Sequence, residues 1–285
     1  MALRDIRDLK DDPEEYQREL ERRWTGLLSY RYIGRNHGSM NTGPEDNTVT
    51  LRRDMRNLTG GLLVAPLSIT SPEGNVGSDL ETVPNPVIHS CVIIDPAPDV
   101  TTIEVVDAEV LHPGTRMGYS RSRIVDADNH DRVIAYLEGQ GARIGTVPEG
   151  LDKMPEDKLE IVDSPDLPPL WKAFGASKRD DGTWQLGELS VELASPDAAL
   201  HIGPQHVVLE TAAMDAAAEV AGTDQLQLEA WHVMFLARGK VGPFRVDAEA
   251  AQGPDGKVAA RMVMHDEGNG DRAVTSATAL FRVVP

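Results

Sequence analysis

The chain has 285 residues, a formal net charge of −18 and 40% apolar residues. That length and apolar content are enough for one large or two ordinary domains with a sizeable buried core. The negative charge opposes binding to nucleic acid or to an anionic membrane, because both are themselves negatively charged. We therefore expect neither as a partner.

The cysteine content and the N-terminal residues narrow the class of protein further. The only cysteine, Cys91, lies in an apolar run, which excludes an intramolecular disulfide and any multi-cysteine metal site. We expect it to be a small buried apolar residue, and the histidines show no metal-ligand spacing. The opening Met-Ala-Leu-Arg-Asp-Ile-Arg-Asp is too charged for a signal peptide, and no apolar run reaches the roughly eighteen residues of a membrane helix. The sequence predicts a cytoplasmic protein without a resident metal.

Residues 1–35 are expected to form a helical extension. Asp12-Pro13-Glu14-Glu15 combines an N-cap residue, a proline in the first turn and early acids, which predicts a helix running to about Leu28. The turn-forming residues between Tyr30 and Asn47 predict a loop. A short strand is expected from Thr48 to Arg53.

Residues 36–147 are expected to form the first domain. Met55 to Ile69 is an apolar helical run, although Pro66 should kink or shorten it, because proline lacks a donor and clashes with the preceding turn. A helix followed by consecutive strands predicts an α+β unit with an antiparallel sheet. After a loop over residues 71–79, the strand-like runs are Val87–Ile94, Thr101–Leu111, Gly118–Asp126 and Val133–Ile144.

Residues 148–185 read as a connection, and residues 186–285 as a second domain that repeats the plan. The connection is rich in proline, and we expect Trp171 and Phe174 to pack back onto one of the domains. A helix is predicted from His201 to Ala221, ended by Gly222. The strands predicted around it are Leu186–Leu193, Gln225–Ala237, Phe244–Ala250, Lys257–His265 and Ala273–Val284.

Two stretches carry the repeat most clearly. One is Asn57-Leu-Thr-Gly-Gly-Leu-Leu-Val-Ala-Pro-Leu-Ser68, and the other is Gly203-Pro-Gln-His-Val-Val-Leu-Glu-Thr-Ala-Ala-Met-Asp215. Each is a short polar or glycine-containing lead into an apolar helical run. A long helix cradled by an antiparallel sheet, twice in one chain, resembles the hotdog fold in a pseudo-dimeric double-hotdog arrangement.

The helix starts resemble the thioesterase branch of that superfamily. There the helix commonly begins Gly-x-x-His-Gly-Gly and carries an acid nine residues after the histidine. Gly203, His206 and Asp215 match this pattern, whereas Val207-Val208 replaces Gly-Gly. The first half keeps Gly60-Gly61 and has Thr59 and Ser68 in the places of the histidine and the acid.

The resemblance implies an acyl-CoA thioesterase-like hydrolase, with CoA as part of the substrate and no separate cofactor. It implies Asp215 as nucleophile or general base, and the amides of Gly60 and Gly61, beside Thr59, as donors to the oxyanion. The other site would pair Ser68 with His206, and without an acid it is expected to be inactive. Gln227, on the strand after the second helix, is a candidate to orient water.

Several alternatives stay open beside this assignment. Glu210 is expected at the surface, but it would be the acid itself if the helix register differs. His206 could merely cap or pack, and Gly60-Gly61 could be only a tight entry to a helix. Pro84-Asn-Pro-Val-Ile-His89 resembles a hydratase motif, but its histidine is one residue late and Val83 stands in place of the aspartate, so we expect a turn before a strand. Arginines expected at the surface rather than on CoA phosphates are Arg116, Arg121, Arg123 and Arg238.

The competing class is a non-catalytic hotdog protein that binds an acyl or polycyclic ligand or acts as a scaffold. The sequence does not separate the two classes, since a fold alone does not fix a function. A double hotdog already contains its own pseudo-dimer, which leaves further homo-oligomerisation open.

Overall fold

The computed structural model describes residues 11–12, 14–15, 27–34, 47–71, 84–143, 159, 161–195 and 198–285. Most of the predicted N-terminal helix, most of the loop after Gly34, the loop after Ser71 and the start of the predicted connection lie outside these residues. The described part of the first helix supports its predicted start, because the side chain of Asp12 accepts a hydrogen bond from the amide of Glu15 at 3.0 Å.

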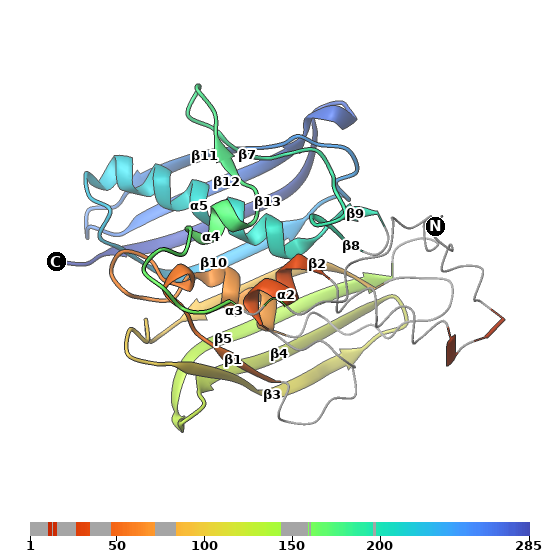
Figure 1. Ribbon diagram of the computed structural model, residues 1–285, viewed down its shortest axis with the longest axis horizontal. Helices are drawn as coiled ribbons and strands as arrows, with labels where there is room; N and C mark the ends of the chain where they lie inside the picture. The colour runs from red at the N-terminus through yellow and green to blue at the C-terminus, as the bar shows by residue number, and fades with distance from the viewer. Residues whose placement is uncertain are drawn as a thin grey trace.

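A single antiparallel sheet of eleven strands carries the fold (Figure 1), in the order β1-β3-β4-β5-β2-β10-β13-β12-β11-β7-β6. Its strands are β1 (Thr48–Thr50), β2 (Pro84–Ile93), β3 (Thr102–Pro113), β4 (Met117–Asp126), β5 (Asn129–Arg143), β6 (Ser177–Lys178), β7 (Trp184–Leu186), β10 (Leu226–Phe235), β11 (Phe244–Gln252), β12 (Val258–Asp266) and β13 (Arg272–Val283). A separate hairpin pairs β8 (Ala194–Ser195) with β9 (Ala199–Leu200).

The strand order contains the same unit twice. In the first half, β1, a helix, β2, β3, β4 and β5 follow one another and assemble as β1-β3-β4-β5-β2. In the second half, β7, a helix, β10, β11, β12 and β13 assemble as β7-β11-β12-β13-β10, which is the same order. The halves join where β2 pairs with β10, from Val92 opposite Ala230 to Ile88 opposite Met234. The predicted α+β class with two tandem hotdog units is confirmed.

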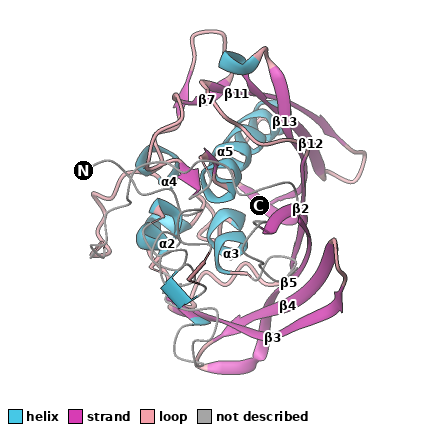
Figure 2. Ribbon diagram, turned by 90° about the vertical axis from the view of Figure 1, so that its right-hand side faces the viewer, coloured by secondary structure: helices cyan, strands magenta, loops and turns pink. Residues whose placement is uncertain are grey.

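The helices lie inside the curve of this sheet. Figure 2 shows α2 (Leu28–Ile33), α3 (Val64–Thr70), α4 (Leu170–Ala173) and α5 (Ile202–Ala221) on the same side of the strands, which bend around them. The strands β10, β11 and β13 pack on α5 and carry the fully buried aromatic side chains of Trp231, Phe244 and Phe281. Among the described residues, no helix is long and apolar enough to cross a membrane.

The central helices start in the same way. α3 begins at Val64 and α5 at Ile202, and each has a proline as its third residue, Pro66 and Pro204. The backbone N–H of that position has no partner within a helix, so proline is tolerated there. Pro66 therefore marks the first turn of a short helix and does not interrupt a longer one.

Some predicted boundaries in the first half are wrong. The run from Met55 is not helical up to Val64, because it contains a 3-10 turn (Arg53–Met55) and a bridge between Arg56 and Leu62. The segment from Tyr30 to Ile33 is helical rather than loop, since α2 buries Tyr30 and Ile33 and ends at Gly34, which adopts φ 88°.

Other corrections concern strands. Pro84 to His89 lies within β2 and is not a turn. The strand predicted from Leu186 to Leu193 is replaced by β7 and a turn, because the chain leaves the sheet after Leu186 and the amide of Leu193 donates to the carbonyl of Ser190. As expected, Phe174 is buried, Trp171 packs on Trp184, and Cys91 is buried.

Candidate active site

Glu210 connects the two halves of the molecule. It is the ninth residue of α5, its residue exposure is only 2%, and its carboxylate oxygens accept hydrogen bonds from the amides of Val64 at 2.6 Å and Ala65 at 2.9 Å. These amides open α3 and have no partner within that helix, and the positive end of the helix dipole favours an anion there. The expectation that Glu210 lies at the surface is wrong.

Burial sets the acidity of this carboxyl group. Desolvation raises the pKa of Glu210 to about 7, against the opposing effect of the two amide hydrogen bonds. An acid that titrates near neutrality can take up and release a proton under ordinary conditions. Cys91 lies close by on β2, where burial and the Glu210 charge raise the pKa of its thiol.

The turn before α3 meets β10, the strand that follows α5. The hydroxyl of Thr59 lies 2.7 Å from Asn57 Oδ1 and 3.2 Å from Gln227 Oε1, and Asn57 Nδ2 donates to the carbonyl of Leu226 at 2.9 Å. A Cβ on Gly61 would lie only 1.8 Å from Gln227 Oε1, so glycine lets the Gln227 side chain come this close, and a larger residue would force it to move. The structure thus brings together Thr59, Gly61 and Gln227 from the predicted site.

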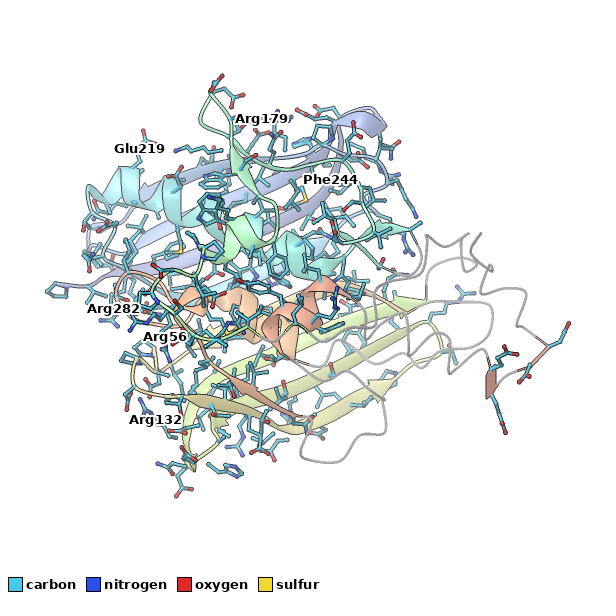
Figure 3. All side chains as sticks on the ribbon, viewed as in Figure 1. Arg56, Arg132, Arg179, Glu219, Phe244 and Arg282 are labelled. Carbon is cyan, nitrogen blue, oxygen red and sulfur yellow. The ribbon has the colours of Figure 1, made fainter. Side chains whose placement is uncertain are left out.

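Arg56 also stabilises this turn. It donates from Nη1 to the carbonyls of Gly60 at 2.9 Å and Ala97 at 2.8 Å, and its position is labelled in Figure 3. The amide of Gly60 donates to the carbonyl of Asn57 at 3.0 Å, and that of Gly61 makes only a long contact of 3.4 Å with the Thr59 hydroxyl. The amide of Gly60 is therefore engaged within the turn, and the oxyanion role of the two glycine amides stays a prediction.

Asp215 lies away from this turn. Its carboxylate pairs with Lys178 at 2.7 Å and accepts from the indole N–H of Trp184 at 3.3 Å, and its side chain is 41% exposed. Five residues along a helix correspond to about 140° of rotation, so Asp215 and Glu210 leave α5 in different directions. The structure thus places Asp215 against Lys178 and Trp184 of the second half, whereas Glu210 contacts the first half, and the catalytic role of Asp215 stays a prediction.

His206 belongs to a second group of polar residues. It is fully buried, accepts a hydrogen bond on Nδ1 from Trp231 Nε1 at 3.1 Å, and has its ring 5.3 Å from that of His89. His89 Nε2 in turn lies 2.7 Å from the hydroxyl of Ser71. Burial lowers the pKa of His89 to about 4 and that of His206 well below its usual value.

The helix starts correct the register of the repeat. The N-cap of α5 is His201, whose side chain accepts from the amide of Gly203, so His206 is not a cap. His206 is the fifth residue of α5 and Ser68 is the fifth residue of α3. Ser68, rather than Thr59, is thus the counterpart of His206. The shared proline was the signal in the sequence that could have found this.

Two of the arginines considered for CoA form surface ion pairs across β3 and β4. Arg121 pairs with Glu109 at 2.8 Å, and Arg123 pairs with Asp107. These contacts agree with the expectation of surface charge at both positions.

The fold is similar to those of solved thioesterase structures. The chain superimposes on the tesB protein of Mycobacterium avium subs paratuberculosis with a TM-score of 0.55 and 12% identity, covering 84% of this chain and 93% of that one. It superimposes on the acyl-CoA thioesterase II TesB2 of Mycobacterium marinum with a TM-score of 0.54 and 13% identity, covering 85% and 95%. No family model matches the sequence. No curated protein sequence matches it either. The molecule therefore has a double-hotdog, thioesterase-like fold.

Proposed function

We propose that the protein is an acyl-CoA thioester hydrolase in which Glu210 is the catalytic acid-base group. The observation that carries this proposal is a buried carboxyl group with a pKa of about 7, seated on the first amides of a helix from the other half. The thioesterases that share the fold support the reaction class. In this proposal Glu210 takes the role that the sequence suggested for Asp215.

The paired hydrogen bonds of Glu210 suggest how the site accommodates a substrate. One carboxylate oxygen accepts from Val64 and the other from Ala65. Rotation of the carboxylate would release one amide to the carbonyl oxygen of a thioester, while the other amide still holds the acid. The helix N-terminus would then stabilise the negative charge that develops on that oxygen.

The proposed reaction needs only these groups and water. Glu210 accepts a proton from a water molecule as its oxygen bonds to the thioester carbonyl carbon. When the tetrahedral intermediate collapses, the carbon–sulfur bond breaks, and the leaving sulfur takes the proton back from Glu210. The products are a carboxylic acid and a thiol.

Gln227 has a positioning role in this proposal. Its Oε1 lies within hydrogen-bond distance of Thr59, and its Nε2 donates to the carbonyl of Leu228 at 3.1 Å. Both ends of the side-chain amide are thus engaged, and the contact of Oε1 with Thr59 connects β10 to the turn that leads into α3. We expect substitution of Gln227 to change activity through the placement of Val64 and Ala65.

The test is hydrolysis of a panel of acyl-CoA esters of different chain length, followed by detection of the free thiol. We expect Glu210→Gln to lower the rate about 10²-fold or more, as for loss of a general acid-base group. Asp215→Asn, five residues further along the same helix, is the matched control and should keep the wild-type rate. Wild-type turnover in Glu210→Gln would contradict the proposal, and so would the absence of turnover for every ester.

A non-catalytic acyl-binding protein is the second candidate. The observation that favours it is the mutual satisfaction of Glu210 and the two amides, which would also serve as a purely structural clip between the halves. Calorimetric binding of a non-hydrolysable acyl-CoA thioether, without turnover of the matching ester, would support this class instead.

A further inference from the structure

The buried imidazoles of His89 and His206 form a polar pair between β2 and α5. Both side chains are buried, and their rings meet edge to face with centroids 5.3 Å apart. The ring of Phe235 also packs on His206, with ring centroids 5.8 Å apart. The reaction proposed above uses neither histidine.

The hydrogen bonds around the pair assign its protons. The indole of Trp231 can only donate, so Nδ1 of His206 is an acceptor and the proton of the neutral ring is on Nε2. The hydroxyl of Ser71 lies 3.1 Å from the carbonyl oxygen of Ser68 and 2.7 Å from Nε2 of His89. We assign its single proton to the carbonyl, so that its oxygen accepts from Nε2–H of His89. Nδ1 of His89 is then an unprotonated acceptor. Burial keeps both rings neutral.

The pair therefore offers one donor and one acceptor. Within the described part of the chain, neither Nε2 of His206 nor Nδ1 of His89 has a hydrogen-bond partner. A buried donor or acceptor without a hydrogen-bond partner is energetically costly. Such atoms therefore indicate a bound group that forms the missing hydrogen bonds. A hydroxyl group accepts from the first and donates to the second. An ammonium has no lone pair for His206, and a carboxylate has no proton for His89.

The pair also lies at a defined place relative to the acid. His206 precedes Glu210 by four residues on α5, so both leave the helix on the same face. Residues at this spacing have Cβ atoms about 5–6 Å apart. A ligand whose carbonyl lies at Glu210 would therefore reach His206 within the first few carbons of its chain.

We propose that His89 and His206 bind a hydroxyl group on the acyl chain, so that the substrate class is a hydroxylated acyl thioester. The position of the carbonyl rests on the proposed function. The hydroxyl site itself does not, because it can be tested with ligands that carry no thioester.

The test is calorimetric binding of decanoate and of hydroxydecanoates with the hydroxyl at successive carbons. We expect one isomer to bind the wild type about tenfold more tightly than decanoate, since only that isomer satisfies both imidazole nitrogens. The gain should vanish in His206→Phe. The gain should persist in His232→Phe, which is the matched control. His232 follows Trp231 on β10, and its side chain forms a hydrogen bond with Ser90 instead of with the imidazole pair.

Equal affinity for decanoate and every isomer in the wild type would overturn the proposal, as would a gain that persists in His206→Phe. If that variant does not fold, a crystal structure of the wild type with the preferred isomer decides. The hydroxyl on both imidazoles supports the site, whereas a water molecule there with the ligand elsewhere overturns it. An isomer preference without any thioester hydrolysis would keep this site and reject the proposed function. Hydrolysis with no preference would do the reverse.

Discussion

The start of α3 and the start of α5 are equivalent places in the repeat, yet they hold opposite chemistry. We call them the first and second half-sites. The first holds Glu210, whose pKa burial raises to about 7. The second holds His201 and His206, with His89 beside them, and burial lowers the pKa of each. Burial disfavours the charged form in both places, so it raises the pKa of the acid and lowers the pKa of the histidines.

Helix length decides which half-site receives the acid. Glu210 is the ninth residue of α5, far enough along to reach the first amides of α3. α3 has only seven residues, so it offers no helical position from which a side chain could reach back in the same way. A difference in the length of one helix is thus enough to make the two half-sites unequal.

We expect the largest effect from acidification, which should destabilise the second half-site. The pKa of His89 falls from 6.5 to about 4 and that of His201 from 6.5 to about 3 on folding. Their stabilising contribution is complete above pH 6.5 and is lost as the pH falls through the folded-state values, because the unfolded chain binds these protons first. From about 1.4 kcal/mol per unit we expect a loss on the order of 5 kcal/mol. Urea unfolding of Glu210→Gln at pH 7 and pH 4 measures it, because this variant lacks the opposite pH response of Glu210.

The matched control for acid unfolding is His112→Phe, which changes an exposed histidine and should leave the profile as it is. His89→Phe should flatten part of the profile. A urea midpoint of Glu210→Gln that does not move between pH 7 and pH 4 would contradict the description of both imidazoles as neutral.

The first half-site should respond to pH in the opposite direction. The pKa of Glu210 rises from 4.5 to about 7 on folding, so its contribution is complete below pH 4.5 and is lost as the pH rises through 7. The loss should be on the order of 3 kcal/mol. Glu210→Gln should lack it, so the difference in unfolding free energy between the two proteins should change with pH over this interval. A constant difference would show that the carboxyl titrates normally.

Gly61→Ala tests the contact between the halves beside the acid. The new Cβ would lie 1.8 Å from Gln227 Oε1, so the side chain or the turn must move. We expect a loss of about 2 kcal/mol in unfolding free energy, typical of overpacking, together with lower activity. Gly61→Ala combined with Gln227→Ala should recover part of the stability. If the single substitution costs nothing in chemical denaturation, the close approach is not present in solution.

Asp215→Asn should have the smallest effect. The pair with Lys178 is solvent-exposed, with side-chain exposures of 41% and 46%. Such pairs contribute about 0–1 kcal/mol, so stability should change by no more than this, and thioester hydrolysis should not change. A large loss of hydrolysis without a loss of stability would return the catalytic role to Asp215.

The fold was predictable because its strands and its long helix carry local signals. Alternation identified most strands of both halves, and Gly222 ended α5 where the sequence placed it, at φ 67°. Short elements were missed because packing rather than local preference forms them. α2 and β7 are examples, since each has only a few residues and is held by burial of side chains such as Tyr30 and Trp184.

The site was harder to predict because its partners are distant in sequence. The surroundings of Glu210 are supplied by Val64 and Ala65, 146 and 145 residues earlier. Nothing near Glu210 in the sequence distinguishes it from a solvated helix residue. Spacing after a Gly-x-x-His pattern favoured Asp215, whereas the prolines at the third residue of each helix give the register that the structure has.

The pairing of β2 with β10 joins the two units into one sheet within one chain. In a dimer of identical chains, any substitution would appear in both half-sites at once. Here each half-site is encoded separately, so an acid can be kept in one and histidines in the other without compromise. Covalent joining thus allows the residues of the two half-sites to differ within one molecule.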